Sequence, residues 1–244
     1  CSGPSAQPVS SGTGEEQSTV RGTAPAGSLN DRLDMWLRLV GPTHASAQDY
    51  ADFLQSGGTW PRWSLLVLRM QQALASETDP QVLARLCHTQ KLTYAPALVQ
   101  CATQLTGDRP LQQQLATEAV SAWTDGNDTP AAASALTGTF GPALTPQSSW
   151  LRFDRQERAG LLSAAQQTLP YLSANQQPVA QARLALRNND ATAQSLLDSL
   201  PSFARKDPWL VLDQARWLRK QQRYDEAVAL WKAGAVEAER TAHS

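Results

Sequence analysis

Residues 208–231 read PWLVLDQARWLRKQQRYDEAVALW, and this stretch decides the fold class. Apolar residues recur in it every three or four positions, which is the spacing of one helical face. The sequence therefore predicts two helices, over 208–221 and 224–240, joined by a short turn. Alanine stands at positions 215 and 227, where two paired helices would have to approach closely.

Large side chains at Leu218, Tyr224 and Trp231 alternate with these alanines. Small residues where helices touch and large ones between them are typical of a tetratricopeptide-like pair. The regular period of about 34 residues that defines such repeats does not run through the whole chain. We therefore expect a degenerate stack of helix pairs rather than a strict tetratricopeptide array.

The same helical spacing continues upstream. A first helix is expected from Leu29 to Val40, a second around Tyr50 to Leu54, a third opening at Trp60-Pro61 and a fourth starting at Asp79-Pro80. Further helices are expected near 93–105, 109–124, 130–139, 147–158, 160–171, 175–187 and 190–199. No stretch alternates with period two, so no sheet is expected. The sequence predicts an all-α fold, a superhelical α-solenoid of short antiparallel helix pairs that is tetratricopeptide-like at its C-terminal end.

The composition agrees with this fold and limits the function. Apolar residues make up 41% of the 244 residues, enough to bury a core. Lys and Arg number 21 against 22 Asp and Glu, so the net charge is -1 and no nucleic-acid partner is expected. No apolar run is long enough for a transmembrane helix.

The first 28 residues differ from the rest. They contain no aromatic residue, Leu or Ile and are rich in Ser, Gly, Thr, Ala and Pro, so they cannot bury enough surface to order themselves. The chain begins at Cys1, as a bacterial lipoprotein does after signal-peptide cleavage; the alternative is a boundary that falls on a cysteine by chance. We expect residues 1–28 to be a flexible lipoprotein tether with its lipid on Cys1, and residues 29–244 to be an α-superhelical domain facing the periplasm from the outer membrane.

The sequence predicts no catalytic residue, no cofactor and no metal site. Glycoside cleavage needs a carboxylic acid with a raised pKa in a cleft, and the glutamates after the tether are expected on solvent faces. These are Glu77, Glu118, Glu157, Glu226, Glu237 and Glu239. The histidines, His44, His88 and His243, lack the spacing of metal ligands. No nucleophile elbow or phosphate-binding glycine loop is present.

Two other cysteines, Cys87 and Cys101, stand 14 residues apart on what we expect to be consecutive antiparallel helices. That arrangement favours a disulfide in an oxidising compartment. Two buried free cysteines are the alternative. Without a Cys-x-x-Cys motif, a bond between them is expected to be structural.

Eight tryptophans are many for this length. Most occupy apolar positions of the helical pattern, and Trp63 is the best candidate for an exposed ring that stacks on a sugar. Arg183, Arg187, Arg216 and Arg219 lie at helical spacings. Their stems are expected to cover apolar seams with the charge in solvent; the alternative is a concave face that meets peptide carboxylates or a second domain.

Four blocks in order resemble the bacterial soluble lytic murein transglycosylases. The first runs from Tyr50 to Leu74 (YADFLQSGGTWPRWSLLVLRMQQAL), and the second joins FGPALT at 140–145 to WLRFDR at 150–155. The third is ARLALR at 182–187, and the fourth lies between Asp207 and Arg219. The blocks cover about residues 48–235, and none is a catalytic signature.

The resemblance implies the superhelical, non-catalytic part of such an enzyme, working on peptidoglycan in the periplasm. In that family a catalytic Glu, followed directly by Ser, lies in a separate lysozyme-like domain. This chain contains no Glu-Ser dipeptide, so it is expected to be inactive by itself, either as the front part of a longer enzyme or after loss of the catalytic part. Peptidoglycan strands or a lysozyme-like domain are the expected partners. The other hypothesis is a stand-alone tetratricopeptide-like lipoprotein that scaffolds envelope proteins.

Overall fold

The computed structural model describes residues 28–235, and this part of the chain is all-helical, as the sequence predicts. Between Ser28 and Ala235 there are thirteen α-helices and no strand. Their bounds are α1 Leu29–Val40, α2 Ala47–Gln55, α3 Trp63–Leu74, α4 Pro80–Thr89, α5 Ala95–Gln104, α6 Arg109–Asp125, α7 Pro130–Phe140, α8 Pro146–Arg158, α9 Leu162–Thr168, α10 Gln176–Asn188, α11 Ala193–Ser199, α12 Pro208–Lys220 and α13 Tyr224–Leu230.

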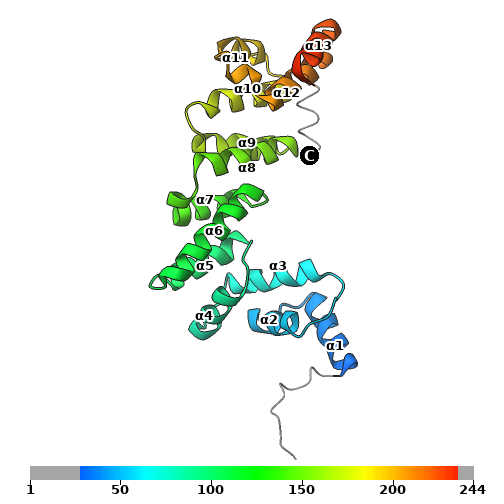
Figure 1. Cartoon of the computed structure of the whole chain (residues 1–244). Helices are drawn as coiled ribbons and strands as arrows, with labels where there is room; N and C mark the ends of the chain where they lie inside the picture. Colours follow the sequence, from blue (N-terminus) through cyan, green and yellow to red (C-terminus); the bar gives the residue numbers. More distant parts are fainter. Residues whose placement is uncertain (1–27, 236–244) are drawn as a thin grey trace, which may run out of the picture.

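The helices follow one another along an elongated column, with α1 near one end and α11 and α13 at the other (Figure 1). Some helices pack most extensively on the next helix in the chain, as α2 does on α3 and α8 on α9. Contacts also skip one helix, joining α5 to α7, α6 to α8 and α10 to α12. The order of the chain is therefore also the order in space.

A recurring signal starts the helices: an Asp or Thr N-cap followed directly or one residue later by proline. The cap side chain accepts a hydrogen bond from the first turn, and proline lacks only an N–H that would have no partner there. The caps of this kind are Asp79, Asp108, Thr129, Thr145 and Asp207. Because these helix starts recur along the chain, each helix is short.

Three clusters of buried apolar side chains hold the column together. The largest extends from Leu39 to Phe140 and joins α1 to α7. A small one joins α8, α9 and α10 around Phe153, and the third joins α10 to α13 around Leu210 and Trp217. In the first cluster a disulfide links Cys87 on α4 to Cys101 on α5, with the two Cα atoms 5.8 Å apart.

Several helix boundaries differ from the sequence prediction, and two of the differences have a clear cause in the backbone. The third helix begins at Trp63 rather than at Trp60-Pro61, because Arg62 has a left-handed backbone with a φ of 58°. The Pro61 carbonyl instead accepts a hydrogen bond from Trp36 Nε1 at 3.0 Å. The helix expected over 224–240 ends as an α-helix at Leu230 and continues as a π-helical turn, Trp231–Ala235, that contains a non-helical Gly234.

Several sequence predictions concern residues beyond the described range. The tether, the lipid attachment at Cys1, His243, Glu237 and Glu239 lie outside residues 28–235. Within that range, none of the helices combines the length and the hydropathy needed to cross a membrane.

Candidate binding surface

A buried charge cluster joins α8, α10 and α12. Its centre is Arg183 on α10, whose side chain is 0% exposed. Its Nη1 donates to Asp154 Oδ1 at 2.8 Å, its Nη2 to Glu157 Oε2 at 2.5 Å and its Nε to Asp213 Oδ2 at 2.9 Å. One guanidinium thus connects three helices by charge-assisted hydrogen bonds.

Burial and charge act against each other in this cluster. Burial lowers the pKa of Arg183, but the surrounding Asp213, Glu157 and Asp154 outweigh it and raise that pKa. Burial has the opposite effect on a carboxyl group and raises the pKa of Asp213 to about 6. The charge of Arg183 opposes this increase, and the charge of Glu157 adds to it. Arg183 therefore stays charged, whereas Asp213 changes its charge near neutral pH.

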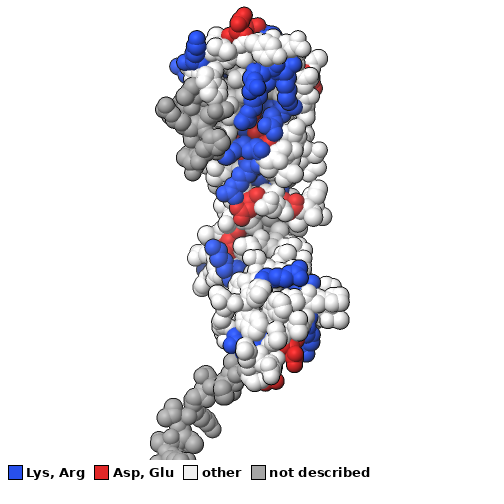
Figure 2. Space-filling model, turned by 90° about the vertical axis from the view of Figure 1, so that its right-hand side faces the viewer, with Lys and Arg blue, Asp and Glu red and all other residues white. Residues whose placement is uncertain are grey.

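A pocket of about 680 Å³ opens beside this cluster, between α10, α12 and α13. Four cationic side chains line it: Arg187 from α10, and Arg216, Arg219 and Lys220 from α12. Apolar side chains complete the lining, among them Leu162, Leu186 and Trp217. Figure 2 shows Lys and Arg gathered in a continuous band over the half of the molecule that contains α8–α13, whereas the other half carries smaller, separate patches.

The cations of the pocket are only partly neutralised. Arg187 Nε lies 3.1 Å from Glu157 Oε1, and Arg216 Nη1 lies 3.7 Å from Asp213 Oδ1, which is too long for a hydrogen bond. Within residues 28–235, no ion pair engages Arg219 or Lys220. The pocket therefore carries net positive charge at its mouth.

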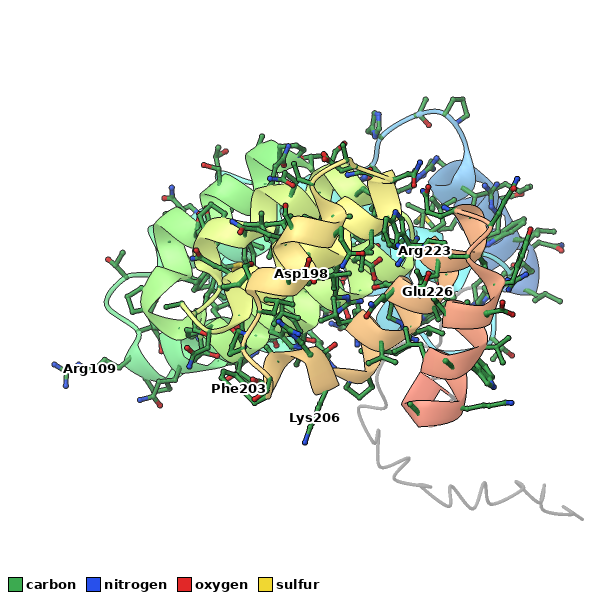
Figure 3. The ribbon with its side chains drawn as sticks, turned by 90° about the horizontal axis from the view of Figure 1, so that it is seen from above. Arg109, Asp198, Phe203, Lys206, Arg223 and Glu226 are labelled. Atoms are coloured by element: carbon green, nitrogen blue, oxygen red, sulfur yellow. A yellow bond between two sulfur atoms is a disulfide. The ribbon has the colours of Figure 1, made fainter. Side chains whose placement is uncertain are left out.

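Two buried polar atoms at the same pocket have no hydrogen-bond partner. They are Trp217 Nε1, on a side chain that is nine-tenths buried, and Asp213 Oδ1. Both atoms are closed off from solvent, so they are unsatisfied groups of the protein interior behind the pocket wall. Nearby, Arg223 lies 5.6 Å from the Trp217 ring and forms an ion pair with Glu226 at 2.6 Å (Figure 3).

A second polar seam, between α6 and α8, has its groups satisfied internally. The Arg152 guanidinium lies 4.0 Å from the Trp123 ring centre. It donates to Asp128 Oδ1 at 2.5 Å and to the Trp123 carbonyl at 3.0 Å, and Trp123 Nε1 donates to Ser149. This seam connects two parts of the column and leaves no charge for a ligand.

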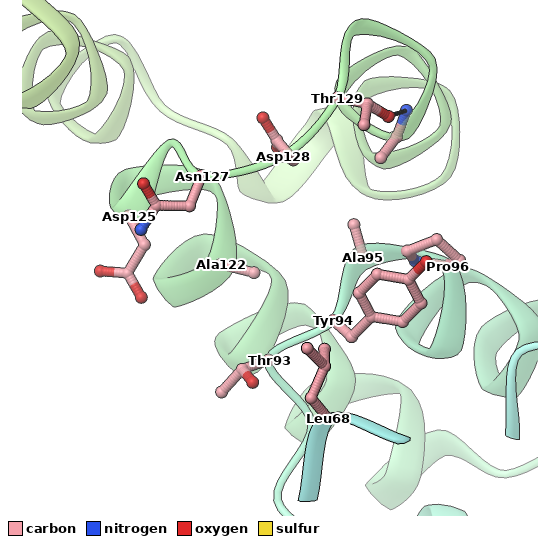
Figure 4. Close-up of a pocket in the computed structure, with 11 residues that line it drawn as sticks. Leu68, Thr93, Tyr94, Ala95, Pro96, Ala122, Asp125, Asn127, Asp128 and Thr129 are labelled. Atoms are coloured by element: carbon pink, nitrogen blue, oxygen red, sulfur yellow. Dashed lines mark hydrogen bonds between the residues drawn. The ribbon is translucent and has the colours of Figure 1, made fainter. Parts of the chain in front are cut away.

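Figure 4 shows another pocket, of about 320 Å³, lined by residues from α3, α5 and the 125–129 segment. Its acidic groups are already used: Asp128 pairs with Arg152, and Asp125 pairs with Arg155. The rest of its lining is mainly apolar, with Leu68, Ala95 and Pro96. It has less to offer a charged ligand than the pocket beside Arg183.

The expected solvent position of the glutamates is wrong for Glu157, whose side chain is 1% exposed. The expectation that the arginine stems cover apolar seams with their charge in solvent is wrong for Arg183, which is held by carboxylates inside the protein. One pocket is lined by the other three arginines of this group, Arg187, Arg216 and Arg219. Trp63 is 36% exposed, the highest exposure of the eight tryptophans.

The histidines of the described range lie apart from one another. His44 lines a pocket near α2 and α3, and His88 lies in the last turn of α4, where its Nε2 is 2.8 Å from Asp108 Oδ2. Among residues 28–235 no group of three His, Cys, Asp or Glu side chains is arranged to hold a metal ion.

A signal for the buried cluster is present in the sequence. Glu157 follows Phe153 by four residues, and Arg183 follows Val179 by four, so both charges stand on apolar helical faces. Glu157 lies on α8 and Arg183 on α10. Opposite charges on the apolar faces of two helices that pack together favour a buried ion pair. Its partners are 26 to 30 residues apart in the chain, which only the stacking of the helices resolves.

No protein-family model matches this chain, and no curated protein or solved structure shows significant similarity to it.

Proposed function

We propose that this chain is a non-catalytic α-solenoid that binds peptidoglycan, as the superhelical module of a lytic transglycosylase does. The band of Lys and Arg along the α8–α13 half is the observation that carries the proposal. Peptidoglycan bears carboxylates on its peptides, and a band of cations attracts such an anionic polymer over several contacts. The resemblance of the four sequence blocks supports the same assignment.

The spacing of equivalent contacts supports the solenoid arrangement. Arg183 on α10 bonds to Asp154, 29 residues before it, and to Asp213, 30 residues after it. Arg187 bonds to the Glu157 carbonyl, again 30 residues away. Contacts that recur at nearly constant separation are those of stacked helix pairs, and such stacks provide long binding surfaces without reactive groups.

In this proposal the chain faces the periplasm from the outer membrane, with the lipid on Cys1 as its anchor. This anchor would keep the module near the cell wall, because several acyl chains together hold a protein stably at a membrane. The protein partner would be a lysozyme-like domain that cuts the glycan.

The direct experiment is to incubate the purified chain with isolated peptidoglycan. We expect the protein in the pellet and no anhydro-muropeptides in the soluble fraction by mass spectrometry. Release of anhydro-muropeptides would contradict the non-catalytic assignment. Protein that stays in the supernatant would contradict the peptidoglycan-binding assignment.

A second candidate, a scaffold for envelope proteins, is favoured by one observation. Two side chains on α13, Tyr224 and Val228, are more than half exposed. Exposed apolar groups on a helix favour contact with another protein or domain. Capture of a defined partner through α13, without any binding to peptidoglycan, would support this candidate.

A further inference from the structure

The pocket beside Arg183 is more specific than a band of surface charge. Its four cations come from two helices and surround one cavity. Arginine presents several N–H donors in a plane and matches the two oxygens of a carboxylate. Three of the four cations are arginines, so the pocket is suited to a planar anion.

The apolar part of the lining adds a further requirement for a ligand. The side chains of Leu162, Leu186 and Trp217 provide a surface for carbon atoms beside the cations. A ligand that uses both parts of the lining carries an anionic group attached to an apolar chain.

We infer that this pocket binds the carboxylate end of a short peptide. The carboxylate would contact Arg216 and Arg219, and the apolar atoms of the peptide would lie against Leu162, Leu186 and Trp217. The inference rests on the proposed function, since it specifies which part of peptidoglycan is bound. A cavity of about 680 Å³ has the size of ordinary ligand sites and accommodates a few residues.

Other anionic ligands fit less well. A free phosphate offers no apolar group for the Leu162 and Leu186 surface. An uncharged glycan strand gives the four cations no anion to pair with. A peptide carboxylate matches the charged and the apolar parts of the pocket together.

Binding of an acidic peptide is expected to strengthen below pH 6. Asp213 faces Glu157 from α8, Arg183 and Arg187 from α10, and Arg216 from its own helix. The pKa of Asp213 is raised to about 6, so its carboxyl becomes neutral as the pH falls through that value. The peptide carboxylate, with a pKa near about 3.5, keeps its charge. Calorimetry at pH 5 and 7.5 should show several-fold tighter binding at pH 5, and Asp213→Asn should remove most of that difference.

The experiment that tests the inference is calorimetric titration of the full chain with N-acetyl-Ala-Glu and with its fully amidated twin, N-acetyl-Ala-Gln-amide. We expect the acid to bind at least about tenfold more tightly than the amide. Arg216→Gln/Arg219→Gln should abolish that preference. Arg109→Gln is the matched control, because Arg109 is exposed and lies far from the pocket (Figure 3).

Equal binding of the acid and the amide, or no binding of either, would overturn the inference. Inorganic phosphate that binds as tightly as the acid would also overturn it, because the pocket would then be a general anion site. The titration is independent of the pellet experiment. Acid-specific binding without pelleting would support the peptide site and contradict the proposed binding to peptidoglycan. Pelleting without acid-specific binding would support the proposed function and contradict the peptide site.

Discussion

Replacing Arg183 with glutamine is expected to lower the free energy of unfolding of the α8–α12 region by about 3–5 kcal/mol. The substitution removes the buried cation that bonds to both Glu157 and Asp213, each about 1% exposed, and leaves them only the more exposed Arg187 and Arg216 as countercharges. Hydrogen exchange by mass spectrometry measures this change helix by helix. Exchange should speed up in α8, α10 and α12 and stay unchanged in α2–α5, which belong to a separate apolar cluster.

Two variants control for this prediction. Arg223→Gln removes an arginine from an exposed ion pair with Glu226 and should leave protection unchanged. A triple variant with apolar residues at 157, 183 and 213 should recover much of the loss, because the three fully buried charges are removed together. A loss below about 1 kcal/mol for Arg183→Gln would contradict the cluster as the connection between these helices.

Removing the disulfide is the second large effect. Cys87→Ala/Cys101→Ala is expected to lower the free energy of unfolding by about 3 kcal/mol, because the bond closes a loop of 14 residues. Both cysteines are fully buried, so part of the loss comes from packing in the α1–α7 cluster. Chemical unfolding followed by circular dichroism, with and without reductant, separates the two contributions.

In that experiment reductant should destabilise the wild-type protein and leave the double variant unaffected. The loss should also be confined to the helices around α4 and α5, which hydrogen exchange resolves. A wild-type protein whose unfolding midpoint does not respond to reductant under denaturing conditions would contradict a stabilising bond between Cys87 and Cys101.

The all-α fold is readable from the sequence because its signals are local. N-caps followed by proline, as at Asp79-Pro80 and Asp207-Pro208, fix where helices start, and the three- to four-residue spacing of apolar residues gives their faces. Boundaries that depend on backbone conformation are harder. Arg62 adopts a left-handed conformation that its residue type does not favour. The helix α3 therefore begins at Trp63, later than the sequence predicts.

The binding surface was only partly predictable, because its contacts are between helices. The sequence identifies Arg183, Arg187, Arg216 and Arg219 as a group at helical spacing, but it does not show which of them is buried. Arg183 is buried because carboxylates from two other helices reach it, whereas Arg219 stays exposed. The helix stacking decides between these environments, and a single helix carries no information about it.

The most direct test of the account compares the binding of pocket variants to two forms of the cell wall. Isolated peptidoglycan carries peptides, and amidase-treated glycan strands do not. With intact peptidoglycan, we predict that the wild-type chain and Arg109→Gln pellet and that Arg216→Gln/Arg219→Gln stays in the supernatant. With peptide-free glycan, we predict that none of the three proteins pellets. Equal pelleting of all three proteins with both materials would contradict the claim that this helical stack holds peptidoglycan through its basic pocket.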